Sequence, residues 1–140
     1  MNQIFLNGTI VPAERAGIAT TDSSFLFGMG LFETMRAANG KVFRLDDHIN
    51  RMLASAAALS IPFGYSADYI QEATSRLLEA NELTDARMRM TLSSGPVSDT
   101  ENIKGTLLIT AAPFTPYPKE YYEKGRSEER RVGKECRSRW

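Results

Sequence analysis

Two Asn-Gly dipeptides constrain the fold of this 140-residue chain more than any other feature. Asn-Gly accepts the positive φ angles that a two-residue hairpin turn requires at both of its central positions. Asn7-Gly8 lies in the middle of residues 3–12, which alternate between apolar and polar side chains. Asn39-Gly40 separates residues 31–38 from residues 41–45, and both segments are rich in apolar and β-favouring residues. The sequence therefore predicts two antiparallel hairpins.

Two amphipathic helices are predicted after the second hairpin. Asp46 can cap the first helix, which the Ser-Ile-Pro sequence at residues 60–62 ends, and Ser66 can cap the second. The apolar positions of these helices are Ile49, Met52, Leu53 and Ala56, and then Ile70, Ala73, Leu77 and Leu78. They recur at helical spacing, so each helix presents one apolar face to a sheet.

Two further strands complete the predicted domain. Residues 86–92 alternate strictly, and residues 105–111 contain an apolar run that suits a buried strand. Gly28 and Gly30 indicate a bend or a close backbone approach where the strand before Asn39 begins. The order of strands, helices and strands predicts an α+β domain, with a small, mostly antiparallel sheet and two helices, over residues 1–112. The prolines after residue 112 indicate that residues 113–125 form the start of an interdomain linker.

Residues 126–140 differ from everything before them. This segment carries six basic and three acidic residues without a helical or strand period, and it holds the chain's only cysteine, Cys136, and only tryptophan, Trp140. It matches the in-frame translation of a common short-read sequencing adapter over all fifteen residues, so we expect it not to be native. The alternative is a natural basic tail that docks on a partner. Without it, 11 basic and 14 acidic residues remain of the 17 of each sign, a net charge of −3.

Charge and composition exclude several classes of function. The balanced total charge does not favour nucleic acid or an acidic membrane surface, and no apolar run approaches the roughly 20 residues of a spanning helix. The N-terminus lacks the pattern of a signal peptide, so we expect a cytoplasmic protein with a small-molecule or protein partner. With one histidine and no cysteine before residue 126, a metal site is not expected. There is no phosphate-binding glycine loop and no Gly-x-Ser-x-Gly nucleophile turn.

A polar stripe lies beside the apolar face of the first predicted helix. His48, Arg51 and Ser55 occur at i, i+3 and i+7, so they project from one side of the helix. The arginine fork offers several fixed donors that suit the oxygens of a phosphate. The stripe is either an anion site or an ordinary solvated helix face.

A second basic feature lies on the strand at residues 86–92. Its alternation places Arg87 and Arg89 on one face and the apolar residues on the other. Two cations on adjacent positions of one face repel each other unless they meet solvent or anions. This face is therefore either exposed or lines a carboxylate site.

Taken together, these segments resemble class IV aminotransferases, which include branched-chain aminotransferases, D-amino-acid aminotransferases and aminodeoxychorismate lyases. The resemblance covers about residues 5–125 and rests on an ordered set of motifs. The set comprises Asn7-Gly8, Asp22, Phe27-Gly28-Met29-Gly30-Leu31-Phe32-Glu33-Thr34, Asn39-Gly40 and His48-Ile49-Asn50-Arg51-Met52. It implies the N-terminal domain of a two-domain fold, pyridoxal 5'-phosphate as cofactor, and a homodimer with its pocket between the domains.

The resemblance also assigns roles to particular residues. It implies that Arg51 binds the phosphate of the cofactor, that Phe32 walls the substrate pocket, and that Arg89 faces substrate carboxylates, as in branched-chain enzymes. Arg87 is a further candidate for the substrate site. Phe27 stands where several members carry a tyrosine, so any hydrogen bond from that hydroxyl is lost here.

The chemistry of the family requires a Schiff-base lysine. None of the five lysines is placed for this role; they are Lys41, Lys104, Lys119, Lys124 and Lys134. In the family, this lysine and the glutamate that pairs with the pyridine nitrogen belong to the second domain. We therefore expect the chain to be an N-terminal fragment that carries no catalytic residue.

The expected activity of the parent protein is amino-group exchange between a branched-chain amino acid and 2-oxoglutarate. Two departures leave the substrate open: Met29 stands where members often have an acid, and Ser94 stands where lyase-like members often have arginine. The paired Arg-x-His of D-amino-acid enzymes is not visible, which counts against that branch. The alternatives are an aminodeoxychorismate lyase, which releases pyruvate, and a non-catalytic domain whose arginine face docks an acidic partner.

Overall fold

A computed structural model describes residues 2–98 and 105–124, and it confirms the expected α+β domain. Within this part of the chain, six strands form one sheet in the order β2-β1-β6-β5-β3-β4, and every neighbouring pair is antiparallel. The strands are β1 (Gln3–Leu6), β2 (Thr9–Pro12), β3 (Gly30–Ala38), β4 (Lys41–Val42), β5 (Ala86–Ser93) and β6 (Thr106–Pro113). The helices are η1 (Ala13–Arg15), α1 (Ser23–Phe27), α2 (Leu45–Ala58), α3 (Ala67–Ala80) and α4 (Lys119–Lys124).

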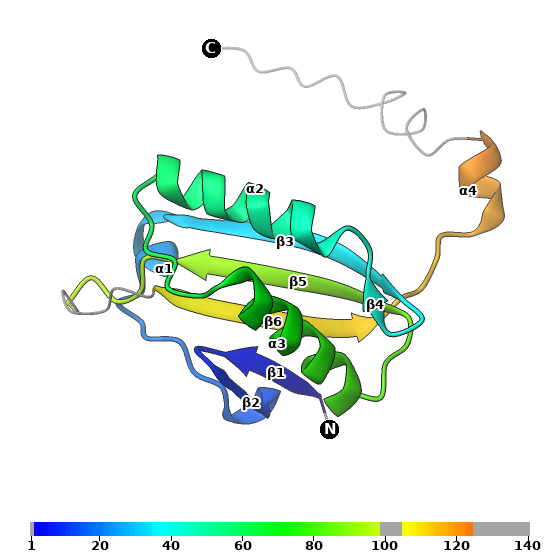
Figure 1. Cartoon of the computed structure of the whole chain (residues 1–140), viewed down its shortest axis with the longest axis horizontal. Coiled ribbons are helices and arrows are strands. Elements are labelled where there is room, and N and C mark those ends of the chain that lie inside the picture. Colours follow the sequence, from blue (N-terminus) through cyan, green and yellow to red (C-terminus); the bar gives the residue numbers. More distant parts are fainter. Residues whose placement is uncertain (1, 99–104, 125–140) are drawn as a thin grey trace, which may run out of the picture.

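The two long helices, α2 and α3, cover one face of the sheet (Figure 1). Alternation in β3, β5 and β6 directs every second side chain toward these helices, and those side chains form the core with the apolar stripes of the helices. The largest fully buried apolar residues are Met35, Ile49, Met52, Ile70, Leu77, Met88, Met90, Leu92, Leu107 and Ile109. Burial of each such side chain stabilises the fold by about 1.5–3 kcal/mol, so this layer holds the domain together.

Both predicted hairpins are confirmed. Asn7 and Gly8 have φ angles of 47° and 100°, and Asn39 and Gly40 have φ angles of 50° and 72°. These positive pairs are the backbone states for which Asn-Gly is favoured. Register follows from the turns, with Leu6 opposite Thr9 and Ala38 opposite Lys41.

The second hairpin is shorter than its sequence predicts. β4 contains only Lys41 and Val42, because Arg44 adopts a left-handed conformation (φ 50°, ψ 42°) and α2 begins at Leu45. The expected cap at Asp46 is therefore wrong: Asp46 lies within the first turn, and the residue at the cap position is Arg44, which makes no side-chain cap bond. Ser66 does cap α3, since its hydroxyl accepts a hydrogen bond from the Tyr69 amide at 3.2 Å.

The segment around Gly28 and Gly30 forms the bend that the sequence predicts, but it also contains a helix that was not expected. α1 is a single turn that Asp22 caps at its N-terminus and that Gly28 ends with φ 69°. At Gly30 the backbone passes close to its neighbours. An added Cβ there would lie 3.1 Å from Ser24 Cβ and 3.3 Å from the Leu92 carbonyl oxygen. This packing fixes the point at which β3 begins.

The face of the sheet that α2 and α3 do not cover carries exposed side chains of β3 and β5. Residues 114–118 then lead irregularly to α4, which lies away from the sheet (Figure 1). The boundaries at residues 112 and 125 stay predictions, and residues 126–140 lie outside the described residues.

Candidate active site

Glu33 interrupts the apolar pattern of β3. Alternation directs Leu31, Glu33, Met35 and Ala37 toward the helices, and three of these four residues are apolar. Glu33 is only 7% exposed. A carboxylate that loses water in this way is costly unless cations and hydrogen-bond donors pair with it.

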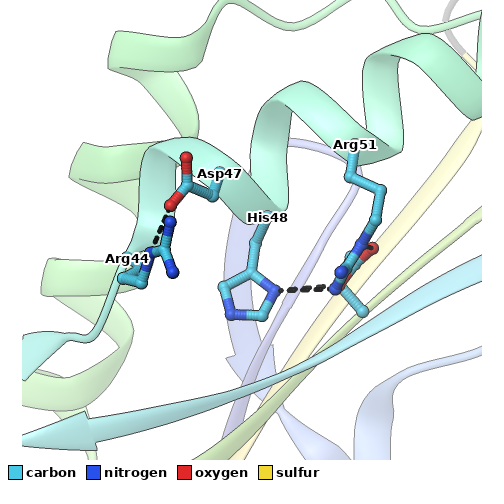
Figure 2. Close-up of polar contacts among 5 residues, drawn as sticks. Arg44, Asp47, His48 and Arg51 are labelled. Carbon is cyan, nitrogen blue, oxygen red and sulfur yellow. Dashed lines mark hydrogen bonds and ion pairs between the residues drawn. The ribbon is translucent and has the colours of Figure 1, made fainter.

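The partners of Glu33 are Arg51 and His48, on the side of α2 that faces β3. Arg51 Nε donates to Glu33 Oε1 at 2.6 Å, and Arg51 Nη2 donates to Glu33 Oε2. His48 Nδ1 lies 2.8 Å from Glu33 Oε2. Figure 2 shows His48 and Arg51 one turn apart on α2, with Arg51 Nη2 3.3 Å from His48 Nδ1. The i, i+3 spacing read from the sequence therefore brings both side chains to one carboxylate.

The charges in this cluster support one another. Hydrogen bonds from Arg51 hold the pKa of the Glu33 carboxyl below its ordinary value; burial opposes this effect and His48 adds to it. The hydrogen bonds that Arg51 donates to Glu33 raise the pKa of the Arg51 guanidinium in turn. Both groups are therefore ionised at neutral pH, and the pair is a fixed salt bridge with two parallel hydrogen bonds.

Arg51 retains donors for a further anion. Its side chain is 65% exposed, and its Nη1 group makes no hydrogen bond within the part of the chain that the structure describes. A guanidinium carries five N–H donors, of which Glu33 uses two. The remaining donors are of the type that binds phosphate oxygens, so Arg51 fits the phosphate of the implied cofactor.

Phe32 and Arg89 form a second group, on the opposite face of the sheet. The Arg89 guanidinium carbon lies 3.9 Å from the centre of the Phe32 ring, and Arg89 Nε donates to Thr91 Oγ1 at 3.4 Å. Phe32 is 59% exposed. Together they present an apolar ring with a cation stacked on it, which can contact an apolar side chain and a carboxylate respectively.

The remaining predicted site residues are Arg87 and Phe27. Arg87 is exposed and stands opposite Arg36 of β3, which is held by Asp85 at 3.3 Å and by stacking on Phe114. Phe27 ends α1 and is 66% exposed. Arg87 and Arg89 are both exposed in the part of the chain that the structure describes, so this face is open to solvent or to a carboxylate ligand.

The free edge of β3 connects the two faces. β4 pairs with β3 only at Ala37 and Ala38, so the edge of β3 from Gly30 to Met35 has no partner strand among the described residues. Phe32 and Glu33 are adjacent on this strand and point to opposite faces. A ligand at this edge can therefore reach residues of both faces.

Sequence reasoning missed the role of Glu33 and of a second buried acid, Asp22. Asp22 is fully buried, and its carboxylate accepts hydrogen bonds from Ser24 N, Ser24 Oγ and Ser93 Oγ. The available signal for Glu33 was an acid at an apolar position of an alternating strand. For Asp22 it was the Asp-Ser-Ser sequence, which is typical of a helix start.

Neither a membrane-spanning helix nor a cluster of three metal-ligating side chains occurs in residues 2–98 and 105–124.

Comparison with known proteins gives the class. The sequence profile described as amino-transferase class IV matches residues 30–139, which is most of the chain, so the chain belongs to this family. A probable branched-chain-amino-acid aminotransferase of Rickettsia felis is 34% identical over 125 residues, which cover 87% of this chain and 42% of that protein. A D-alanine aminotransferase of Staphylococcus aureus is 34% identical over 83 residues, which cover 59% of this chain and 29% of that protein.

A solved structure agrees with the fold. The branched-chain aminotransferase of Thermoproteus uzoniensis, crystallised with norvaline, has a TM-score of 0.73 and 30% identity. The matched region covers 84% of this chain and 42% of that one, so the chain spans about two fifths of the length of its branched-chain relatives. Identity alone does not separate the branched-chain from the D-amino-acid branch, since both match at 34%.

Proposed function

We propose that this chain supplies part of the cofactor site and part of the substrate site of a pyridoxal-phosphate-dependent branched-chain aminotransferase. The observation that carries the proposal is the Glu33–Arg51 pair, which fixes a guanidinium and leaves its Nη1 group without a hydrogen bond to any described residue. The cofactor, when bound, supplies an electron sink for the bond changes at the substrate carbon.

Arg51 is the proposed ligand of the cofactor phosphate. Its remaining N–H groups bind phosphate oxygens, and its charge offsets theirs. His48 contacts the carboxylate that Arg51 is paired with, so it supports the arrangement without having to touch the phosphate.

Phe32 and Arg89 are the proposed substrate residues, and Arg87 and Phe27 are secondary candidates. The exposed Phe32 ring offers apolar surface to a branched side chain, and Arg89 offers a cation to the distal carboxylate of 2-oxoglutarate. One site that accepts both substrates in turn needs both features, because one substrate is apolar where the other is charged. The proposed enzyme is homodimeric and cytoplasmic, and light scattering on the full-length protein tests the first of these.

The cofactor assignment predicts that Arg51→Ala in the full-length protein weakens pyridoxal phosphate binding about tenfold to about 100-fold, the range for a hydrogen bond to a charged group. Equilibrium dialysis measures the change. Arg76→Ala is a matched control, since Arg76 is an exposed arginine of α3 whose ion pair is with Glu72. Equal affinity of the Arg51 variant and the control would remove Arg51 from the cofactor site.

A substrate panel tests the activity. Full-length protein is assayed with leucine, valine and D-alanine against 2-oxoglutarate, and separately with aminodeoxychorismate. We expect turnover of leucine and valine, and we expect Arg89→Met to raise KM for 2-oxoglutarate more than KM for leucine. D-alanine transamination is the second candidate, because the staphylococcal relative has the same identity, 34%, over 83 residues as the rickettsial one has over 125. Turnover of D-alanine alone or of aminodeoxychorismate alone would overturn the branched-chain assignment.

A further inference from the structure

At the position of Glu33, an apolar residue would pack against the core without the cost of burying a charge. The other residues of β3 that point toward the helices are Leu31, Met35 and Ala37, all apolar and all in contact with the core. Glu33 is the only acidic residue of β3, and it lies at the same buried face. Its position therefore points to a role in the arrangement of its two partners.

Among the described residues, the side-chain hydrogen-bond partners of Glu33 lie on one side of α2. Oε1 accepts from Arg51 Nε at 2.6 Å, and Oε2 accepts from Arg51 Nη2 and lies 2.8 Å from His48 Nδ1. Two parallel hydrogen bonds fix both the place and the plane of a guanidinium, which is flat and rigid. Without them, a side chain that is 65% exposed would sample many rotamers.

We propose that Glu33 is a positioning residue for phosphate: it holds the Arg51 guanidinium so that Nη1, the end that Glu33 does not contact, is presented to the phosphate group. This inference rests on the proposed function and adds a residue to it. His48 acts one step further away, since it contacts the carboxylate oxygen Oε2 that Arg51 Nη2 also contacts.

The proposal predicts an effect whose sign is opposite to that of charge alone. A carboxylate close to a phosphate repels it, so removal of the Glu33 charge would tighten phosphate binding if Coulomb interaction were the whole effect. A positioning role predicts the reverse, because the entropy of ordering Arg51 would then be lost only when phosphate binds. The direction of the change separates the two explanations.

The test uses the complete 140-residue chain and inorganic phosphate as the probe. Arginine side-chain NMR follows the Nε–H of Arg51, which is a direct report on its bond to Glu33. In the unmodified chain we expect this proton to exchange slowly with water and to shift saturably as phosphate is added. In Glu33→Gln we expect fast exchange and a phosphate dissociation constant that is higher by about tenfold or more.

Asp47→Asn is the matched control. Asp47 acts on Arg51 through charge but is hydrogen-bonded to Arg44 at 2.5 Å and not to Arg51 (Figure 2). This variant removes one negative charge near the site and leaves the Glu33–Arg51 fork intact. Its phosphate dissociation constant should stay unchanged or fall slightly, and the Arg51 Nε–H should remain slow to exchange.

A second variant tests the proposal in case Glu33→Gln does not fold. Glu33→Asp keeps the charge but is one methylene shorter, so it cannot reach both nitrogens of Arg51 from the same backbone position. Positioning predicts that it weakens phosphate binding as Glu33→Gln does, and it becomes the deciding variant if circular dichroism shows that Glu33→Gln is unfolded.

The outcomes separate this inference from the proposed function. Phosphate binding that is equal or tighter in the folded Glu33 variants overturns the positioning role, even if Arg51→Ala abolishes binding and thereby supports the cofactor site. An equal loss in Asp47→Asn also overturns it, since charge would then explain the effect. If Arg51→Ala binds phosphate as well as the unmodified chain does, the positioning role and the cofactor assignment are both overturned. The same holds if the unmodified chain shows no shift when phosphate is added.

Discussion

Asp22 joins the start of α1 to the end of β5, and its removal should destabilise the chain strongly. Its Oδ1 accepts from the Ser24 amide at 2.9 Å and from the Ser24 hydroxyl at 2.6 Å, and its Oδ2 accepts from the Ser93 hydroxyl at 2.8 Å. Burial raises the pKa of Asp22, but the hydrogen bonds from Ser24, Ser93 and Thr106 together outweigh burial, so the pKa lies below its ordinary value. The carboxylate is therefore charged and buried, and both of its oxygens accept hydrogen bonds.

The magnitude follows from what Asp22→Ala leaves behind. The cap of α1 contributes about 1 kcal/mol, and each hydrogen bond to a charged group contributes about 1.5–3 kcal/mol. Ser93 is 3% exposed, so its hydroxyl keeps only the Gly95 amide as a partner. Part of this loss is offset because the carboxylate no longer has to be desolvated. We expect the free energy of unfolding to fall by about 2–4 kcal/mol for Asp22→Ala and by about 1–2 kcal/mol for Ser93→Ala.

Urea denaturation followed by circular dichroism measures these losses, and a double-mutant cycle isolates the pair. Because each single change removes the same hydrogen bond, the double variant should lose about 1–2 kcal/mol less than the sum of the singles. Ser75→Ala is the control, since Ser75 is exposed on α3 and should change stability by less than about 0.5 kcal/mol. A coupling energy below about 0.5 kcal/mol would refute the claim that Asp22 and Ser93 act as one unit.

Two further predictions concern pH and association. The pKa values of Asp22 and Glu33 are held below their ordinary values of 3.8 and 4.5, so their contribution to stability is complete above about pH 4.5 and is lost as pH falls through the folded-state values. Urea midpoints at several pH values check this, and Glu33→Gln should flatten the dependence. The exposed aromatics of α1, Phe25 and Phe27, at 75% and 66% exposure, should promote self-association. Their replacement by serine should lower the mass measured by sedimentation, and an unchanged mass would exclude this surface.

The hairpins and long helices could be predicted because their signals are local. Asn7-Gly8 and Asn39-Gly40 define their turns through their own φ angles, and the apolar stripes of α2 and α3 need only a sheet to cover. The same locality explains why His48 and Arg51 could be assigned to one side of a helix. What they bind depends on a residue of another element, 18 positions before Arg51, and periodicity carries no information on that contact.

The helix α1 could not be predicted from the sequence, because contacts with a distant strand determine its conformation. Residues 23–27 favour a strand by composition, yet they form α1, because Asp22 caps the turn and is itself held by Ser93 of β5. The Asp-Ser-Ser sequence signals a cap, but its strength comes from a strand that lies about 70 residues later. Local conformational propensity contains no information on that long-range contact.

The short β4 has a consequence for the candidate site. The buried residues Ile49, Met52 and Ala56 fix which side of α2 faces the sheet, and successive side chains of a helix are rotated by about 100°. Arg44 takes a left-handed conformation that an arginine adopts at some cost, and α2 therefore starts at Leu45. Because Met52 is buried against the sheet, the preceding residue, Arg51, lies at the margin of the apolar face of α2, where its guanidinium reaches Glu33. The short β4 also leaves the edge of β3 from Gly30 to Met35 without a partner strand among the described residues.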